Sequence, residues 1–203
     1  MTNFPDKLRL KERAEEDIYF ARRDRELIAA LHRDRRPSLV LAVVRCGGQS
    51  GVDRGVLDAV LAYSERTGIV AAGWCPRGRM AEDGVIDARY PLNETPDADP
   101  AQRTEWNVRD ADATLILHRG ELAGGTALTQ QVATRLDKPL FLIDLRLDRG
   151  GPVVAAELSA WLQREAVRVL NVAGPRESEC PGIAAQAREL MQSLLTTLVG
   201  KNR

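Results

Sequence analysis

The stretch Arg45–Gly55, RCGGQSGVDRG, follows a short apolar run, LVLAVV, at residues 39–44. A run of leucine and β-branched residues of this length is typical of a strand that is covered on both faces. From Val52 to Thr67 the apolar residues have helical spacing, and Gly68 follows as a stop signal. The stretch therefore predicts a strand, a turn with few side chains, and a helix, in that order.

The same alternation of strand and helix continues along the chain. Further strands are predicted at residues 69–74, 113–118, 139–145 and 166–174, and further helices at 102–110, 126–136, 154–163 and 183–198. This order implies right-handed crossovers and a mostly parallel sheet with helices on both faces. We therefore predict a Rossmann-like α/β three-layer sandwich over residues 37–203. Residues 73–100, rich in Gly, Pro, Asp and Arg, are expected to form a long loop, of a kind that is usually either functional or mobile.

The first 36 residues differ in character from the rest of the chain. They contain ten basic and eight acidic side chains, and apolar residues recur at helical spacing from Leu10 to Leu31. This pattern predicts a charged amphipathic helix over residues 1–36 that ends before Pro37. We expect the helix to pack on its own domain or on a second copy of the chain. The near balance of charge argues against a basic arm that binds nucleic acid.

The composition narrows the class of protein further. The 203 residues include 29 basic and 29 acidic side chains, so no net charge favours nucleic acid or an anionic membrane. No apolar run approaches the roughly 20 residues that span a bilayer, and the N-terminus lacks the apolar core of a secretory signal. Three widely spaced cysteines and two histidines do not have the spacing of a metal site. A cytoplasmic protein with reduced thiols, bound neither to membrane nor to nucleic acid, is expected.

Three glycine-containing turns fall at the carboxyl ends of predicted strands, the edge at which parallel sheets bind ligands. They are Arg45–Gly55, Gly124–Thr129 (GGTALT) and Gly174–Ser178 (GPRES). A helix N-terminus exposes unpaired amides, and glycine lets the backbone approach a phosphate closely. Helix capping explains any one turn by itself. The three together predict a site for a phosphorylated small molecule.

The candidate ligand-binding residues come from these turns, from the start of the long loop, and from the helix before the third strand. They are Gly47, Gly48, Gln49, Ser50, Gly51, Asp53, Arg54, Trp74, Arg77, Asn107, Gly124, Gly125, Thr126, Thr129, Gly174, Pro175, Arg176 and Ser178. Asp53 either favours the helix dipole or binds a hydroxyl or base edge, and Arg54 is either solvated or bound to a charged ligand group. Trp74 beside Arg77 suits stacking combined with phosphate pairing, although arginines in loops often serve solubility alone.

These segments resemble a known family. GGQSGVDRG, GWCPRGRMAEDG, YPLNET, RTEWNVRDADATLIL, GGTALT and LNVAGPRES are similar to motifs of the molybdenum-cofactor carrier proteins. That family lies within the Rossmann-like SLOG superfamily, which also includes the cytokinin-activating LOG phosphoribohydrolases. The resemblance covers roughly residues 39–198. It implies a homo-oligomer, dimer or tetramer, with a pocket for a pterin- or nucleotide-like phosphorylated ligand at the strand ends.

One departure from the phosphoribohydrolase pattern bears on catalysis. Those relatives carry a motif similar to GGxGTxxE, whereas here Gln130 and Gln131 stand where carboxylates would be. An amide cannot act as a general base, which typically contributes about 10²–10⁴ in rate. The first interpretation is therefore a carrier or sensor that binds molybdenum cofactor or a nucleotide, with no catalytic residue assigned. The alternative is a nucleotide N-glycosidic hydrolase acting on nucleoside monophosphates or NAD-type nucleotides. Asp53, Glu82, Asp83 and Glu121 are then the remaining candidate carboxylates.

Overall fold

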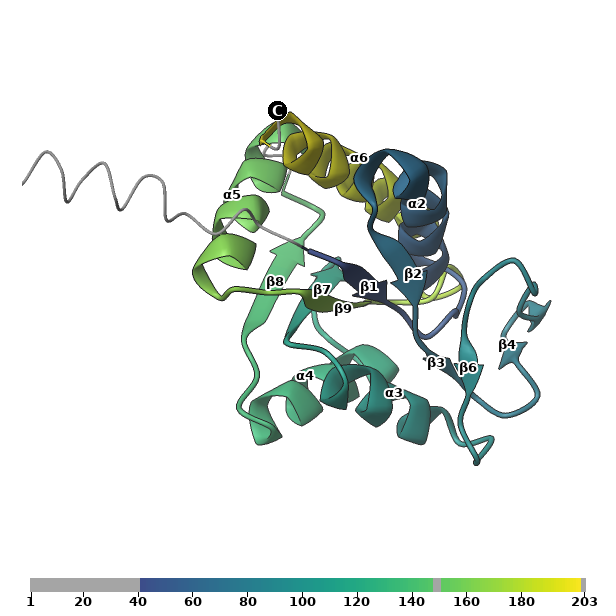
Figure 1. Cartoon of the computed structure of the whole chain (residues 1–203). Helices are drawn as coiled ribbons and strands as arrows, with labels where there is room; N and C mark the ends of the chain where they lie inside the picture. The colour runs from purple at the N-terminus through teal and green to yellow at the C-terminus, as the bar shows by residue number, and fades with distance from the viewer. Residues whose placement is uncertain (1–40, 148–150, 202–203) are drawn as a thin grey trace, which may run out of the picture. The chain divides into compact units, whose positions relative to one another are not determined.

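The computed structural model describes residues 41–147 and 151–201 (Figure 1). The helix expected over residues 1–36, and the domain division that depends on it, lie outside these residues. The strands of the central sheet are β1 (Val43–Arg45), β2 (Val70–Ala72), β7 (Ala113–His118), β8 (Leu140–Asp144) and β9 (Val169–Ala173). The helices are α2 (Val52–Thr67), α3 (Pro100–Arg109), α4 (Gly124–Arg135), α5 (Gly151–Arg164) and α6 (Ile183–Lys201).

The five strands are parallel and stand in the order β2-β1-β9-β7-β8. Helices α2, α5 and α6 pack together on one face of the sheet, and α3 and α4 pack together on the other (Figure 1). The predicted Rossmann-like three-layer arrangement is therefore confirmed. Strand β9, the last in the chain, pairs with both β1 and β7 at the centre of the sheet.

The main core lies between the sheet and the three helices α2, α5 and α6. Leu115 and Leu117 of β7 and Leu194 of α6 are fully buried in it. Each such side chain contributes about 1.5–3 kcal/mol by leaving water. Gly55 lets α2 and α6 approach closely, because a Cβ at this position would overlap the carbonyl group of Ala184. The other face has a smaller cluster, in which Val108 of α3 packs near Val132 of α4.

Several boundaries differ from those predicted. The first strand, expected at 39–44, is β1 at Val43–Arg45, and the second, expected at 69–74, divides into β2 and β3 (Trp74–Cys75). The division falls at Gly73, whose φ of 150° and close approach to the Cys46 backbone leave no room for a side chain. Helix α4 begins two residues before the predicted start, so its two glycines belong to the first helical turn.

The segment 73–100, predicted as a loop with little regular structure, contains four short strands. Strand β3 pairs in parallel with β6 (Asn93–Glu94), and β4 (Met80–Ala81) forms an antiparallel hairpin with β5 (Gly84–Val85). Arg79 holds this segment together, because its guanidinium donates to four backbone carbonyl oxygens between Ile86 and Leu92 at 2.9–3.2 Å. Strands are predicted from alternating apolar residues, and a segment held by hydrogen bonds from an arginine side chain does not need that alternation. The prediction therefore missed the short strands of this segment.

Within residues 41–147 and 151–201, no helix has both the length and the apolar character that crossing a bilayer requires.

Candidate functional site

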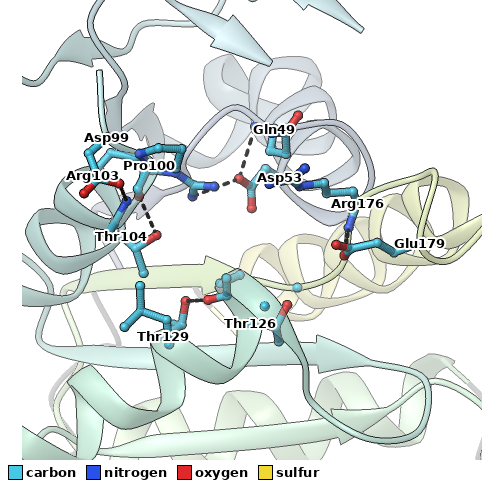
Figure 2. A pocket seen from close by; sticks show the side chains of 16 residues that line it. Gln49, Asp53, Asp99, Pro100, Arg103, Thr104, Thr126, Thr129, Arg176 and Glu179 are labelled. Atoms are coloured by element: carbon cyan, nitrogen blue, oxygen red, sulfur yellow. Dashed lines mark hydrogen bonds and ion pairs between the residues drawn. The ribbon is translucent and has the colours of Figure 1, made fainter. Parts of the chain in front are cut away.

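A cavity of about 270 Å³ lies at the carboxyl ends of β1, β7 and β9 (Figure 2). The helices that follow β7 and β9 lie on opposite faces of the sheet, so the cavity occupies the position where open α/β sheets bind ligands. Four segments line it: the β1–α2 turn, the starts of α3 and α4, and the β9–α6 connection. Its lining residues are Gln49, Asp53, Asp99, Pro100, Ala101, Arg103, Thr104, Gly124, Gly125, Thr126, Leu128, Thr129, Ala173, Gly174, Arg176 and Glu179.

The N-terminus of α4 meets this cavity without a side-chain cap. The side chain of the N-cap residue, Ala123, offers no acceptor, and no described residue accepts a hydrogen bond from the amides of Gly124 or Gly125. A Cβ added to Gly125 would meet nothing within 4 Å. The Thr129 hydroxyl donates to the carbonyl oxygen of Gly125 at 2.8 Å and so holds the turn in place. Unpaired amides and the positive end of the helix dipole make this turn suited to an anion.

A buried ion pair lies beside the α4 turn. Arg103, from α3, places its Nη1 atom 3.6 Å from Oδ2 of Asp53, and the two side chains are 14% and 5% exposed. The backbone amide of Gln49 also donates to Asp53 Oδ2 at 3.2 Å. Burial raises the pKa of Asp53, and the positive charge of Arg103 opposes that shift. Arg176 lies on the side of Asp53 opposite Arg103 (Figure 2), so two guanidinium groups border the cavity.

The other carboxylates of the cavity are bound to backbone amides. Asp99 caps α3 by accepting from the amide of Ala101 at 2.9 Å. Glu179 accepts from the amide of Arg176 at 3.1 Å. Because α3 is capped in this way and α4 is not, the α4 turn offers the better position for an incoming anion.

The glycines of the β1–α2 turn have a different environment. A Cβ at Gly47 would overlap the guanidinium of Arg103, and one at Gly48 would overlap the side chain of Leu92. Gly51 has a φ of 78°, and its Cβ would lie 2.7 Å from the carbonyl carbon of Arg176. The absence of side chains in this turn is therefore explained by contacts within the protein.

A second cavity, of about 430 Å³, is lined by three segments, two of which continue from residues that line the first cavity. Ser50 follows Gln49, and Glu177 follows Arg176. The second cavity is lined by Ser50, Gly51, Arg54, Glu82, Asp83, Glu177 and Ser178. Arg54 forms a bidentate ion pair with Asp83, at 2.7 and 2.9 Å.

The structure thus separates the predicted ligand-binding residues into three groups. Gln49, Asp53, Gly124, Gly125, Thr126, Thr129, Gly174 and Arg176 line the first cavity. Ser50, Gly51, Arg54 and Ser178 line the second. Gly47, Gly48, Trp74, Arg77, Asn107 and Pro175 line neither of these two cavities. The binding role of all of them stays a prediction.

Trp74 and Asn107 bind each other. The Asn107 side chain accepts from the backbone amide of Trp74 at 2.8 Å and donates to its carbonyl oxygen at 2.9 Å. The Trp74 indole donates to Asp110 at 2.7 Å and meets the Trp106 ring edge to face at 4.8 Å. These contacts fix β3 against α3. Arg77 is exposed near this segment.

Arg103 is the functional candidate that the sequence interpretation missed. The signal was present in Asp99–Pro100, a capping residue followed by proline at the first helical position. This pair starts α3 at Pro100, two residues earlier than predicted, and Arg103 near the start of this helix reaches Asp53, a contact that the helix start alone does not predict.

No group of three or more His, Cys, Asp or Glu side chains is arranged to hold a metal ion in the described part of the chain. Cys46 and Cys75 are buried. Burial, with the nearby Asp53 charge, raises the pKa of the Cys46 thiol well above its ordinary value, and burial also raises that of Cys75. Gln130 and Gln131 line neither cavity.

A parallel sheet with a cavity at its carboxyl edge and an uncapped helix N-terminus defines a Rossmann-like α/β protein of the ligand-binding class. A model of the circularly permutated YpsA SLOG family matches residues 44–195, and the chain belongs to this family. It is also similar to a crystal structure described as "Putative molybdenum carrier protein" from Syntrophus aciditrophicus SB. The two chains are 38% identical with a TM-score of 0.71, over 77% of this chain and 96% of the other. No curated protein matches the chain.

Proposed function

We propose that the chain is a carrier or sensor that binds a phosphorylated heterocycle, either molybdenum cofactor or a nucleotide-like molecule. The observation that carries this proposal is the uncapped N-terminus of α4, where the amides of Gly124 and Gly125 have no acceptor among the described residues. A phosphate group satisfies such amides and is stabilised by the helix dipole. Arg103 and Arg176 border the same cavity as guanidinium donors. Its carboxylates, those of Asp53, Asp99 and Glu179, are bound to protein groups.

The size of the cavity agrees with this class of ligand. Its volume of about 270 Å³ lies near the lower end of the range for small-molecule sites, roughly 300–1,000 Å³. It accommodates a phosphate group with part of a ring system. A longer ligand extends beyond it.

Molybdenum cofactor is the cargo suggested by the name of the similar structure. The cavity fits its phosphate better than its metal, because phosphate acceptors match amide and guanidinium donors. Neither Cys46 nor Cys75 lines the cavity, and burial keeps both thiols protonated at neutral pH. In this proposal the protein therefore binds the cofactor through its phosphate and ring.

The test is to identify the ligand of the natively purified chain. Its bound small molecules are released by denaturation, identified by mass spectrometry, and analysed for molybdenum by elemental analysis. We expect a phosphorylated heterocycle near one equivalent in the native chain and a strongly reduced amount in Gly125→Asp, which fills the α4 turn with a carboxylate. If the native chain carries no phosphorylated species and binds neither nucleotides nor inorganic phosphate, the proposal is wrong.

One observation favours the second candidate, a nucleotide N-glycosidic hydrolase. Asp53 is a buried carboxyl in the cavity whose pKa is raised, and a carboxyl with a raised pKa can serve as a general acid. A panel of nucleoside monophosphates and dinucleotides, assayed for release of the free base, separates the two candidates. Base release by the native chain that Asp53→Asn abolishes would replace the carrier proposal with the hydrolase.

We also propose that the chain forms a homo-oligomer in the cytoplasm, as the resemblance to carrier proteins implies. Support comes from the edge strand β8, where Leu142 is 41% exposed at an open side of the sheet. Light scattering of the full chain should give the mass of a dimer or tetramer. The same measurement after deletion of residues 1–36 shows whether that segment is required for assembly.

A further inference from the structure

The tip of the β4–β5 hairpin inserts a carboxylate between the first and third glycine turns. The carboxylate of Glu82 accepts hydrogen bonds from the hydroxyls of Ser50 and Ser178, and from the backbone amide of Ser178 at 3.2 Å. The Ser50 oxygen itself accepts from the amide of Glu177 at 3.2 Å, which leaves its hydroxyl hydrogen directed to Glu82. Two loops that are distant in the sequence thus converge three donors on one anionic group.

Polar contacts hold this tip to the rest of the domain. Of the apolar residues that flank it, Met80 and Val85 are 54% and 70% exposed and only Ala81 packs against the core, so the tip buries little apolar surface. Its remaining contacts are the Arg54–Asp83 ion pair and the hydrogen bond from the Glu82 amide to the Gln49 side chain at 2.9 Å. Arg79 fixes the base of the segment independently of the tip. The tip can therefore move away without disrupting the rest of the segment.

We propose that the Ser50 hydroxyl, the Ser178 hydroxyl and the Ser178 amide form a second anion-binding subsite, which Glu82 fills as a tethered competitor. Two hydroxyl donors and one amide donor suit the oxygens of a phosphate group as well as those of a carboxylate. The hydrogen bonds from Ser178 and Ser50 lower the pKa of Glu82, so the competitor is an anion at neutral pH.

The subsite deepens the proposed function and rests on it for the identity of the first anionic group. Gln49 and Arg176 line the first cavity, and the residues that follow them, Ser50 and Glu177, line the second. The proposal extends to a single elongated molecule that spans these two pairs of neighbouring residues. Such a molecule carries one phosphate at the α4 turn and a second phosphate or carboxylate that displaces Glu82.

The test uses the full ¹⁵N-labelled chain and inorganic phosphate as the probe, with residue-specific amide shifts as the readout. In Glu82→Ala, we expect the amides of Ser178 and Glu177 to shift and saturate at a phosphate concentration at least tenfold lower than in the native chain. Glu94→Ala is the matched control, because Glu94 is another exposed carboxylate of the same segment that accepts from a backbone amide, that of Gly78. It should behave as the native chain does.

A second variant separates a true subsite from a loosened hairpin. Adding Ser50→Ala to Glu82→Ala removes one donor and should reverse most of the gain in phosphate response at Ser178. If Ser178 responds equally in Glu82→Ala and in the native chain, or if Ser50→Ala leaves the gain intact, the subsite proposal is wrong.

The amides of Gly124 and Gly125 report on the first cavity in the same spectra. A response at Ser178 in Glu82→Ala without any response at these glycines would support the subsite and contradict the proposed function. The opposite pattern would leave the proposed function standing and overturn the subsite.

Discussion

Two of the three glycine turns at the ligand edge, Arg45–Gly55 and Gly124–Thr129, look alike in the sequence and serve different purposes in the structure. In the first turn, side chains at Gly47, Gly48 and Gly51 would overlap other parts of the protein. In the second turn, a side chain at Gly125 would enter open space. The first turn therefore uses glycine to pack the site, and the second uses it to leave the site accessible.

The backbone amides differ in part, because those of Gly48 and Gly51 in the first turn have no acceptor among the described residues either. In the first turn, the amides of Gln49 and Ser50 donate to the side chains of Asp53 and Gln49, and that of Val52 donates to the carbonyl oxygen of Pro175 at 3.3 Å. In the second turn, those of Gly124 and Gly125 have no described acceptor. A glycine-rich turn thus indicates a ligand site where its amides remain unpaired and the space beside them is also open.

The largest expected effect is that of a substitution in the first turn, Arg45–Gly55, which is packed against other parts of the protein. Gly51→Ala places a methyl group against the backbone of Pro175–Glu177, at a φ of 78° that disfavours alanine. We expect the free energy of unfolding to fall by about 2–4 kcal/mol, measured by urea denaturation. Gly68→Ala is the control, because Gly68 has a similar φ of 70° with nothing within 4 Å of the added Cβ, and it should lose about 1–2 kcal/mol. Equal losses would show that contact with the third glycine turn contributes nothing.

The next largest effect is that of a charged substitution in the second turn, Gly124–Thr129, which is open. Gly125→Asp places a carboxylate at the uncapped N-terminus of α4, where it competes with any incoming anion. We expect the Kd for inorganic phosphate at this turn to rise about 10- to 100-fold, which corresponds to about 1.4–2.8 kcal/mol, as measured by titration of the Gly124 amide shift. The free energy of unfolding should stay unchanged or rise by about 0.3–1 kcal/mol, because an acidic side chain favours the helix dipole. Unchanged phosphate affinity would remove α4 as the anion site.

A third, smaller effect concerns anion affinity, which should depend on the charge of Asp53. As the pH falls through its raised pKa, Asp53 becomes neutral and the charge of Arg103 is no longer offset. Sulfate, whose charge is constant over this range, should therefore bind more tightly at lower pH. Asp53→Asn should bind it about 5-fold more tightly at pH 7, with a flatter pH profile. Weaker sulfate binding in this variant would mean that the carboxylate itself holds Arg103 in its binding position.

The same group affects stability in a definite direction. Because the pKa of Asp53 is higher in the folded chain than the ordinary value of about 4, its contribution to stability is fully present below that ordinary value. The contribution is lost as the pH rises through the raised pKa. Urea denaturation of the native chain and of Asp53→Asn over this window should show that decline in the native chain alone.

The smallest expected effect is that of an uncharged substitution in the open turn. Gly125→Ala adds a methyl group in open space at a helical position, and alanine favours a helix over glycine by at most about 1 kcal/mol. We expect the free energy of unfolding to stay within about 0.5 kcal/mol or to increase slightly. A loss as large as that of Gly51→Ala would contradict the difference between the two turns.

Much of the fold follows from the sequence because its signals are local. Helix α2 has the predicted bounds, since Gly68 takes the left-handed conformation that ends it, and β7 has the predicted bounds because all but its last residue is buried. The strands β4 to β6 were missed, because the side chain of Arg79 bonds the backbone of that segment and its few buried apolar residues have no strand periodicity. The Arg103–Asp53 pair was missed because its members are far apart in the sequence.

The sequence by itself determined the parallel sheet, its alternating helices and the edge at which the three turns gather, since apolar periodicity and helix signals act over a few residues. It could not determine which turn is open. The space around a glycine is set by segments such as α3, the β4–β5 hairpin and the β9–α6 connection, which reach it only through the tertiary fold. Packing therefore decided which turn has open space beside its unpaired amides.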